Sequence, residues 1–220
     1  VDRSRGLGDV YKRQIFDLEN ILQTIENEFE KNFLIIGITS NKKRHIQYNP
    51  YPKENEINHA ETHIKNIVSN FLPSVLNYLN VNFENTNQIV AGASMGGLMS
   101  IKTSILFPQF RNIISLSPAF WFGYPRVLYD VKNLSNESST YLYTGKKEGH
   151  IFGDHVKNIF SNDWDLDFSN NDDFYYSGVK KIEDSLKSNN KTVIFSYQEN
   201  GHHNETSWAT AILDILGKLI

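Results

Sequence analysis

Short, dense apolar runs occur at five places along the chain. Each run spans four to seven residues and is rich in Val, Ile, Leu, Phe or Tyr. Runs of this length and composition are typical of strands that are buried on both faces of a sheet. The predicted strands are residues 33–39, 88–91, 112–116, 139–144 and 192–197.

Around these runs, apolar residues recur every three or four positions, which is the period of a helix with one buried face. Residues 41–58 lack this period, are polar, and are predicted to form a loop. We expect Pro73 to kink the helix that follows this loop or to divide it in two, because proline has no N–H to donate. The predicted helices are residues 15–31, 60–79, 95–107, 172–186 and 208–219.

Strands that alternate with helices predict an α/β fold with a mainly parallel sheet and helices on both faces. The chain has 220 residues, which is enough for one domain with one sizeable core. Apolar residues make up 40% of the chain, but no apolar run approaches the roughly 18 residues that a membrane span needs.

The overall charge and the absence of cysteine exclude several classes of function. A formal net charge of -3 gives no electrostatic case for binding nucleic acid. The sequence has no cysteine, which rules out a thiolate nucleophile, a disulfide framework and a cysteine-based zinc site. These features leave the compartment and the oligomeric state open.

The first residues resemble a segment of foreign origin. Residues 4–14, SRGLGDVYKRQ, match codon by codon the translation of a transposon adapter used in sequencing libraries. The alternative explanation is a native, basic and flexible N-terminus. Segments of foreign origin are excluded from fold reasoning. We therefore expect residues 1–14 to be non-native and residues 15–220 to form a single domain that begins in the middle of a gene.

Residues 92–97, GASMGG, carry a Gly-x-Ser-x-Gly pattern between a predicted strand and a predicted helix. In that context the serine lies at the apex of a sharp turn, and glycines two residues away on either side avoid a collision. The N–H of the following residue then faces a developing oxyanion. The pattern predicts Ser94 as a nucleophile and Met95 as an oxyanion donor. The alternative interpretation is a glycine-rich turn with an inert serine.

A pair of histidines follows the last predicted strand. In hydrolases with this serine pattern the chain order is serine, acid, histidine. A histidine in such a loop can reach the serine across the carboxyl edge of the sheet. We predict His203 as the general base, with His202 as the alternative. Two surface histidines without a role are the competing interpretation.

Acidic residues follow the preceding predicted strand, and Glu148 is the first of them. A carboxylate at this place can accept a hydrogen bond from the histidine Nδ1 and fix its tautomer. We predict Glu148 as the acid, with Asp154 as the alternative; a solvated glutamate that balances the neighbouring lysines is the competing interpretation. His150, Asp154 and His155 match no metal-ligand spacing, so we expect no metal site.

Aromatic residues follow the predicted strand at 112–116. Ligands of open α/β sheets bind beyond the carboxyl ends of the strands, so Trp121 and Tyr124 are predicted to contact the substrate. Phe120 and Phe122 are explained equally well by core packing.

Taken together, the motifs resemble those of the esterase D family of α/β-hydrolases. That family includes enterochelin-esterase-like and feruloyl-esterase-like hydrolases and the mycolyl transferases. In its histidine loop the catalytic histidine directly precedes an asparagine, which favours His203. The resemblance is carried by residues 92–97 (GASMGG), 115–121 (SLSPAFW), 145–148 (GKKE) and 201–205 (GHHNE) together with Trp208.

The resemblance implies an α/β-hydrolase fold, no cofactor, and acyl transfer from a small-molecule ester to water. It covers nearly all of residues 33–220. Family members begin with several further strands, and a loop after one of these strands supplies a second oxyanion N–H. We therefore expect a domain whose first strands are missing. Loss of one such donor typically costs ~10²–10³ in kcat.

The predicted mechanism is two-step acyl transfer through an acyl-enzyme on Ser94. Three other interpretations use the same residues or the same fold. An acyltransferase would pass the acyl group to an alcohol, and a peptidase would act on amides. A catalytically inactive binding protein would keep the fold and would ignore serine-directed probes.

Overall fold

The computed structural model describes residues 23, 27, 34–40, 42–82, 86–161 and 163–219. Within these residues, four parallel strands form one sheet in the order β1-β2-β3-β4, the same as their order along the chain. All four carboxyl ends therefore meet at one edge of the sheet. The strands are β1 (Ile89–Ala93), β2 (Asn112–Leu116), β3 (Ser139–Lys147) and β4 (Thr192–His202).

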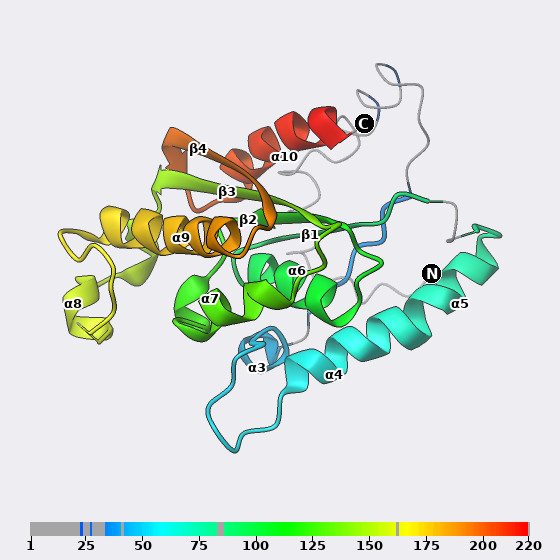
Figure 1. Cartoon of the computed structure of the whole chain (residues 1–220), viewed down its shortest axis with the longest axis horizontal. Helices are drawn as coiled ribbons and strands as arrows, with labels where there is room; N and C mark the ends of the chain where they lie inside the picture. The colour runs from blue at the N-terminus through cyan, green and yellow to red at the C-terminus, as the bar shows by residue number, and fades with distance from the viewer. Residues whose placement is uncertain are drawn as a thin grey trace.

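Helices connect the strands and cover both faces of the sheet (Figure 1). The three longest that touch the sheet are α6 (Met95–Leu106), α9 (Asn171–Ser188) and α10 (Glu205–Leu219). The remaining elements are α3 (Arg44–Gln47), α4 (His59–Asn66), the π-helical turn η1 (Ile67–Phe71), α5 (Leu72–Tyr78), η3 (Phe120–Phe122), α7 (Arg126–Asp130), η4 (Val131–Asn133), η5 (Gly149–Phe152) and α8 (Val156–Ile159).

The side chains of β2 alternate between two cores, as the period of a strand requires. Ile113 packs in the cluster that α6 and α9 form on one face. Ile114 and Leu116 pack against α10 on the opposite face. Figure 1 shows α10 on one side of the sheet and α6 and α7 on the other, with α4 and α5 outside α6. Both faces of β2 are thus apolar and buried.

The predicted strand at 112–116 and the predicted helices around the sheet are confirmed. β3 and β4 continue three and five residues beyond the predicted ends at Thr144 and Tyr197. The helix that carries Pro73 continues in helical dihedrals, but its hydrogen bonding changes: α4 passes into the π-helical turn η1 and then into α5, which carries the proline in its first turn. The predicted helix at 15–31 lies outside the described residues, apart from two isolated positions.

The predicted strand at 33–39 is wrong over the part that the structure describes. Residues 34–40 have no regular secondary structure, and Leu34 and Ile35 are 46% and 47% exposed. A strand is stable only when a neighbouring strand takes up its N–H and C=O groups. No strand of the described chain pairs with this segment, so its apolar pattern alone does not make it a strand.

Among the described residues, no helix combines the length and the hydrophobicity that a membrane span requires.

Candidate active site

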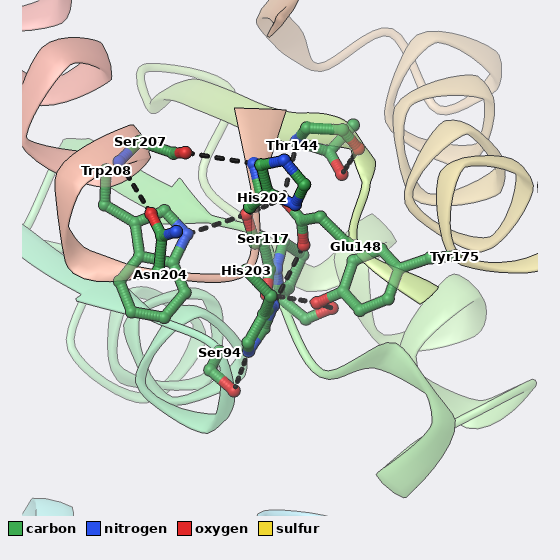
Figure 2. Close-up of polar contacts among 12 residues, drawn as sticks. Ser94, Ser117, Thr144, Glu148, Tyr175, His202, His203, Asn204, Ser207 and Trp208 are labelled. Atoms are coloured by element: carbon green, nitrogen blue, oxygen red, sulfur yellow. Dashed lines mark hydrogen bonds and ion pairs between the residues drawn. The ribbon is translucent and has the colours of Figure 1, made fainter. Parts of the chain in front are cut away.

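Each of the four parallel strands is followed directly by a polar residue. Ser94 comes after β1, Ser117 after β2, Glu148 after β3 and His203 after β4. Because the carboxyl ends of parallel strands meet at one edge, residues far apart in the sequence become neighbours there. Figure 2 shows these four residues joined by dashed contacts.

Ser94 lies at the turn between β1 and α6 with a backbone φ of 57° and ψ of −121°. Such a conformation is unfavourable for a residue with a Cβ and needs support from its surroundings. The Ser94 N–H donates to the Leu116 carbonyl at 2.9 Å. Its own carbonyl accepts from the N–H groups of Gly97 and Ala119, both at 3.0 Å. These bonds hold the serine at the apex of the turn.

The turn requires glycine at one position for a steric reason. A Cβ on Gly92 would lie 2.2 Å from the carbonyl oxygen of Gly96. That contact is far too short, and both atoms belong to backbone that the turn itself fixes. Met95 is the first residue of α6, so its N–H has no acceptor within the helix. The backbone N–H predicted to hold an oxyanion is therefore next to Ser94 and outside the helical ladder.

His203 connects the serine to the acid. Its Nε2 lies 3.0 Å from the Ser94 Oγ, and its Nδ1 lies 2.9 Å from Oε2 of Glu148. An ionised carboxylate only accepts hydrogen bonds, so Nδ1 carries the proton of a neutral imidazole. Nε2 then presents its lone pair to the Ser94 hydroxyl. The arrangement can remove a proton from that hydroxyl and return it to another group.

Glu148 is completely buried, and its carboxylate is satisfied on both oxygens. Oε2 accepts from His203, whereas Oε1 accepts from the Ser117 hydroxyl and from the Gly145 N–H, each at 2.6 Å. A buried carboxylate is tolerated when it is paired and hydrogen-bonded in this way. The three donors also fix the rotation of the carboxyl group.

Two aromatic rings flank the imidazole of His203. The ring of Trp208 meets it edge-on at a centroid distance of 4.9 Å, and the ring of Tyr175 lies 5.4 Å away. The His203 side chain is only 10% exposed as a result. Complete burial, together with the nearby charge of Glu148, holds the pKa of the Tyr175 hydroxyl well above its usual value. Tyr175 therefore stays neutral beside the acid.

Comparison with protein families identifies the family of the chain. The family model described as "Putative esterase" matches residues 12–219. The chain belongs to this esterase family. Its enzyme class is that of the carboxylic-ester hydrolases. No curated protein matches the chain by sequence.

Solved structures of esterases have the same fold. The siderophore hydrolase EstA from Aspergillus nidulans matches with a TM-score of 0.67 and 14% identity, over 94% of this chain and 80% of that one. A ferulic acid esterase matches with a TM-score of 0.63 and 14% identity, over 94% and 78%. The enterobactin esterase FES from Shigella flexneri matches with a TM-score of 0.51 and 16% identity, over 76% and 42%. At such low identities these likenesses establish the α/β-hydrolase fold that the sequence motifs predicted.

The two alternatives left open by the sequence lie elsewhere. The ring of His202 lies beside that of His150 at 5.8 Å, and its backbone N–H donates to the Ser207 hydroxyl at 3.0 Å. Asp154 accepts from the backbone N–H of His155 at 2.6 Å and from the side chain of Asn158 at 3.2 Å. Neither alternative contacts the imidazole of His203 through these bonds.

The two aromatic residues predicted to contact substrate lie at different distances from this chain of contacts. The ring of Trp121 packs against Tyr175 at 5.4 Å, so it is one ring removed from His203. Tyr124 packs against Trp164 at 4.8 Å and against Phe120 at 6.3 Å. Trp121 is therefore linked to His203 through one ring, Tyr175, whereas Tyr124 is linked to it through two, Phe120 and Tyr175.

A cavity of about 690 Å³ opens beside the site without including it. Its lining is polar and charged, and none of Ser94, Glu148 and His203 contributes to it. Its composition does not suit the acyl group of an ester, so we do not assign the substrate to it. The lining includes Lys146, Lys147, His150, Asp172, Glu199 and His202.

Three residues around the acid and the histidine carried no predicted role in the site. Ser117 and Trp208 lie in stretches that carried the family resemblance, and their position next to a strand end and after the histidine loop was a usable signal. Tyr175 lies inside α9 and reads as an ordinary core residue, so no pattern in the sequence distinguishes it.

Proposed function

We propose that the chain hydrolyses small-molecule carboxylic esters with Ser94 as nucleophile, His203 as general base and Glu148 as the orienting acid. One observation carries this proposal: a single imidazole lies 3.0 Å from a hydroxyl and 2.9 Å from a buried carboxylate. A serine alone is a weak nucleophile, and it becomes reactive when an adjacent base takes its proton. The esterase family and the fold support the same chemistry.

In the first step, Oγ of Ser94 forms a bond to the ester carbonyl carbon while His203 Nε2 takes the hydroxyl proton. The carbonyl electrons move to the oxygen, which becomes an oxyanion and accepts a hydrogen bond from the Met95 N–H. The positive end of the α6 dipole favours this negative charge. Glu148 stabilises the imidazolium that forms.

The tetrahedral intermediate then collapses. The bond to the leaving oxygen breaks, and His203 returns its proton to that oxygen, so that an alcohol departs and an acyl group stays on Ser94. A water molecule then attacks the acyl carbon and loses a proton to His203. The resulting intermediate collapses, the bond to Ser94 breaks, and the carboxylic acid departs. Ser94 regains its proton at the end.

For substrate contact we propose Trp121 first and Tyr124 second, because fewer ring contacts separate Trp121 from His203. The structural neighbours include a siderophore hydrolase, an enterobactin esterase and a ferulic acid esterase. A substrate with an aromatic group on one side of the ester fits the aromatic ring of Trp121.

Hydrolysis of a p-nitrophenyl ester tests the proposal. Ser94→Ala removes the nucleophile, and we expect turnover to fall by about 10⁶-fold, to background. Ser104→Ala is the control, because Ser104 lies in α6 away from His203, is completely buried and donates to the Phe110 carbonyl at 2.7 Å. Circular dichroism checks that both variants fold. Turnover by folded Ser94→Ala at the rate of the unsubstituted chain would refute the assignment.

A further inference from the structure

The residue that follows β2 has no role in the mechanism above, although its three counterparts after β1, β3 and β4 do. We propose that this residue, Ser117, is a positioning residue of the same site: it orients the carboxylate of Glu148 and anchors both rings that flank His203. This inference rests on the proposed function.

The backbone of Ser117 is held in an uncommon conformation. Its φ is 44°, in the left-handed region that residues with a Cβ rarely adopt. Its N–H donates to the Tyr143 carbonyl at 2.7 Å, and the residue is completely buried. Strain of this kind persists where the surroundings enforce it, and it is commonest at functional sites. Here the result is that the hydroxyl reaches the acid.

The hydroxyl of Ser117 has only one possible direction of hydrogen bonding. The indole N–H of Trp208 donates to the Ser117 Oγ at 2.9 Å, and an indole can only donate. The serine is therefore an acceptor in that contact, and its single proton is free for Oε1 of Glu148 at 2.6 Å. Trp208 thus donates to Ser117, and Ser117 donates to Oε1 of Glu148. The other carboxylate oxygen, Oε2, accepts the Nδ1 proton of His203.

The same serine fixes the two flanking rings. The Tyr175 hydroxyl donates to the Ser117 carbonyl at 2.6 Å, while Trp208 donates to its hydroxyl. These are the rings that lie 5.4 Å and 4.9 Å from the imidazole of His203. Ser117 is thus hydrogen-bonded to the acid that orients His203 and to both aromatic residues that restrict the imidazole. A small displacement of Ser117 would change all three contacts together.

Ser117→Ala tests the proposal, because it removes the hydroxyl and keeps a residue with a Cβ at the same φ. We expect kcat for ester hydrolysis to fall about 10- to 100-fold, the usual worth of a hydrogen bond to a charged group. KM should change little, because the hydroxyl is buried behind Glu148. The downfield NMR resonance of the proton between His203 and Glu148 should shift or broaden. Ser104→Ala, the buried serine control, should change neither quantity.

Trp208→Phe gives a second and independent readout. It keeps an aromatic ring against His203 and removes the indole N–H that directs the Ser117 hydroxyl. We expect a loss in kcat of about 3- to 10-fold, smaller than for Ser117→Ala, because the serine can still donate to Glu148. If Ser117→Ala does not fold, this variant decides alone, and a kcat within about twofold of the unsubstituted chain would overturn the proposal.

The controls separate this inference from the proposed function. If Ser94→Ala retains turnover, the proposed function itself fails. If Ser94→Ala is inactive and folded Ser117→Ala has the kcat and the NMR resonance of the unsubstituted chain, only the role of Ser117 fails. A loss in kcat with an altered resonance, at nearly constant KM, supports the positioning role.

Discussion

Two segments of this chain have nearly the same apolar pattern and very different structures. Residues 112–116 (NIISL) form β2, whose last four residues are buried, whereas residues 34–39 (LIIGIT) form no strand and expose Leu34 and Ile35. β2 has β1 on one side and β3 on the other. The segment at 34–39 has no strand partner in the described chain. Pairing with neighbouring strands, and not the apolar run itself, therefore makes a strand of such a segment.

The paired strands also carry the residues of the candidate site. The ends of β1 to β4 present Ser94, Ser117, Glu148 and His203 to one another in consecutive order across the sheet. Strand pairing thus fixes the backbone from which these side chains extend. No strand pairing fixes the backbone of residues 34–39 in this way within the described chain.

The largest expected effect concerns the acid at the end of β3. We expect Glu148→Gln to lower kcat by about 10³- to 10⁴-fold, because the amide can donate to Nδ1 and so favour the wrong tautomer of His203. Asp154→Asn makes the same chemical change a few residues away, at a carboxylate that binds only neighbouring groups of its own loop. In steady-state ester hydrolysis, kcat of Asp154→Asn should lie within about twofold of that of the unsubstituted chain. Equal losses in the two variants would break the assignment of the acid.

The next effect compares the two apolar runs directly. Ile114 in β2 is completely buried, and Ile35 is 47% exposed. We expect Ile114→Ala to lower the free energy of unfolding by about 2–5 kcal/mol, because it leaves a cavity against α10. Ile35→Ala should change it by less than about 0.5 kcal/mol. Urea denaturation of both variants measures the difference, and similar values for both would show that the two segments are equally packed.

The smallest effect concerns Tyr175, whose pKa is raised by burial and by the charge of Glu148. The unfolded chain releases this proton near pH 10, and the folded chain releases it at higher pH. The stabilisation is therefore complete below about pH 10 and is lost as the pH rises further, by at most about 1.4 kcal/mol per pH unit. Tyr175→Phe should make the fall in unfolding free energy between about pH 10 and 11 shallower.

Tyr129→Phe is the control for that measurement, since Tyr129 is 67% exposed. Its unfolding free energy should fall with pH as steeply as that of the unsubstituted chain. A fall that is equally steep in Tyr175→Phe would contradict the raised pKa of Tyr175.

Much of the fold was predictable from the sequence because its strands are dense apolar runs. β2 has the predicted bounds, while β3 and β4 extend into polar residues that carry no apolar signal. The extension is what brings Glu148 and His203 to the first position after each strand. Pairing at the carboxyl edge, which joins Lys147 to His202 beyond a bulge, depends on tertiary contacts that a single segment does not encode.

In the candidate site, too, some features were predictable from a local pattern and others depend on tertiary packing. The sharp turn at Ser94 was predictable because its glycine pattern reflects a local steric demand, the collision that a Cβ on Gly92 would make with Gly96. The sequence favoured Glu148 over Asp154 but left both open, since both follow β3; the hydrogen bonds of Ser117 and His203 to Glu148 depend on tertiary packing. The place of Tyr175 in the site was not predictable, because no sequence motif marks it and its hydrogen bond to the Ser117 carbonyl spans 58 residues.

The most direct test of the central claim is labelling of the full chain with a fluorophosphonate probe, read out by intact mass and peptide mapping. Such probes bond to a serine that an adjacent base has activated. We predict one adduct per chain, on the peptide that contains Ser94, with no adduct in Ser94→Ala and much slower labelling in Glu148→Gln. Labelling of Ser94→Ala at the same rate, or no labelling of the folded unsubstituted chain, would contradict the claim that His203 and Glu148 activate Ser94.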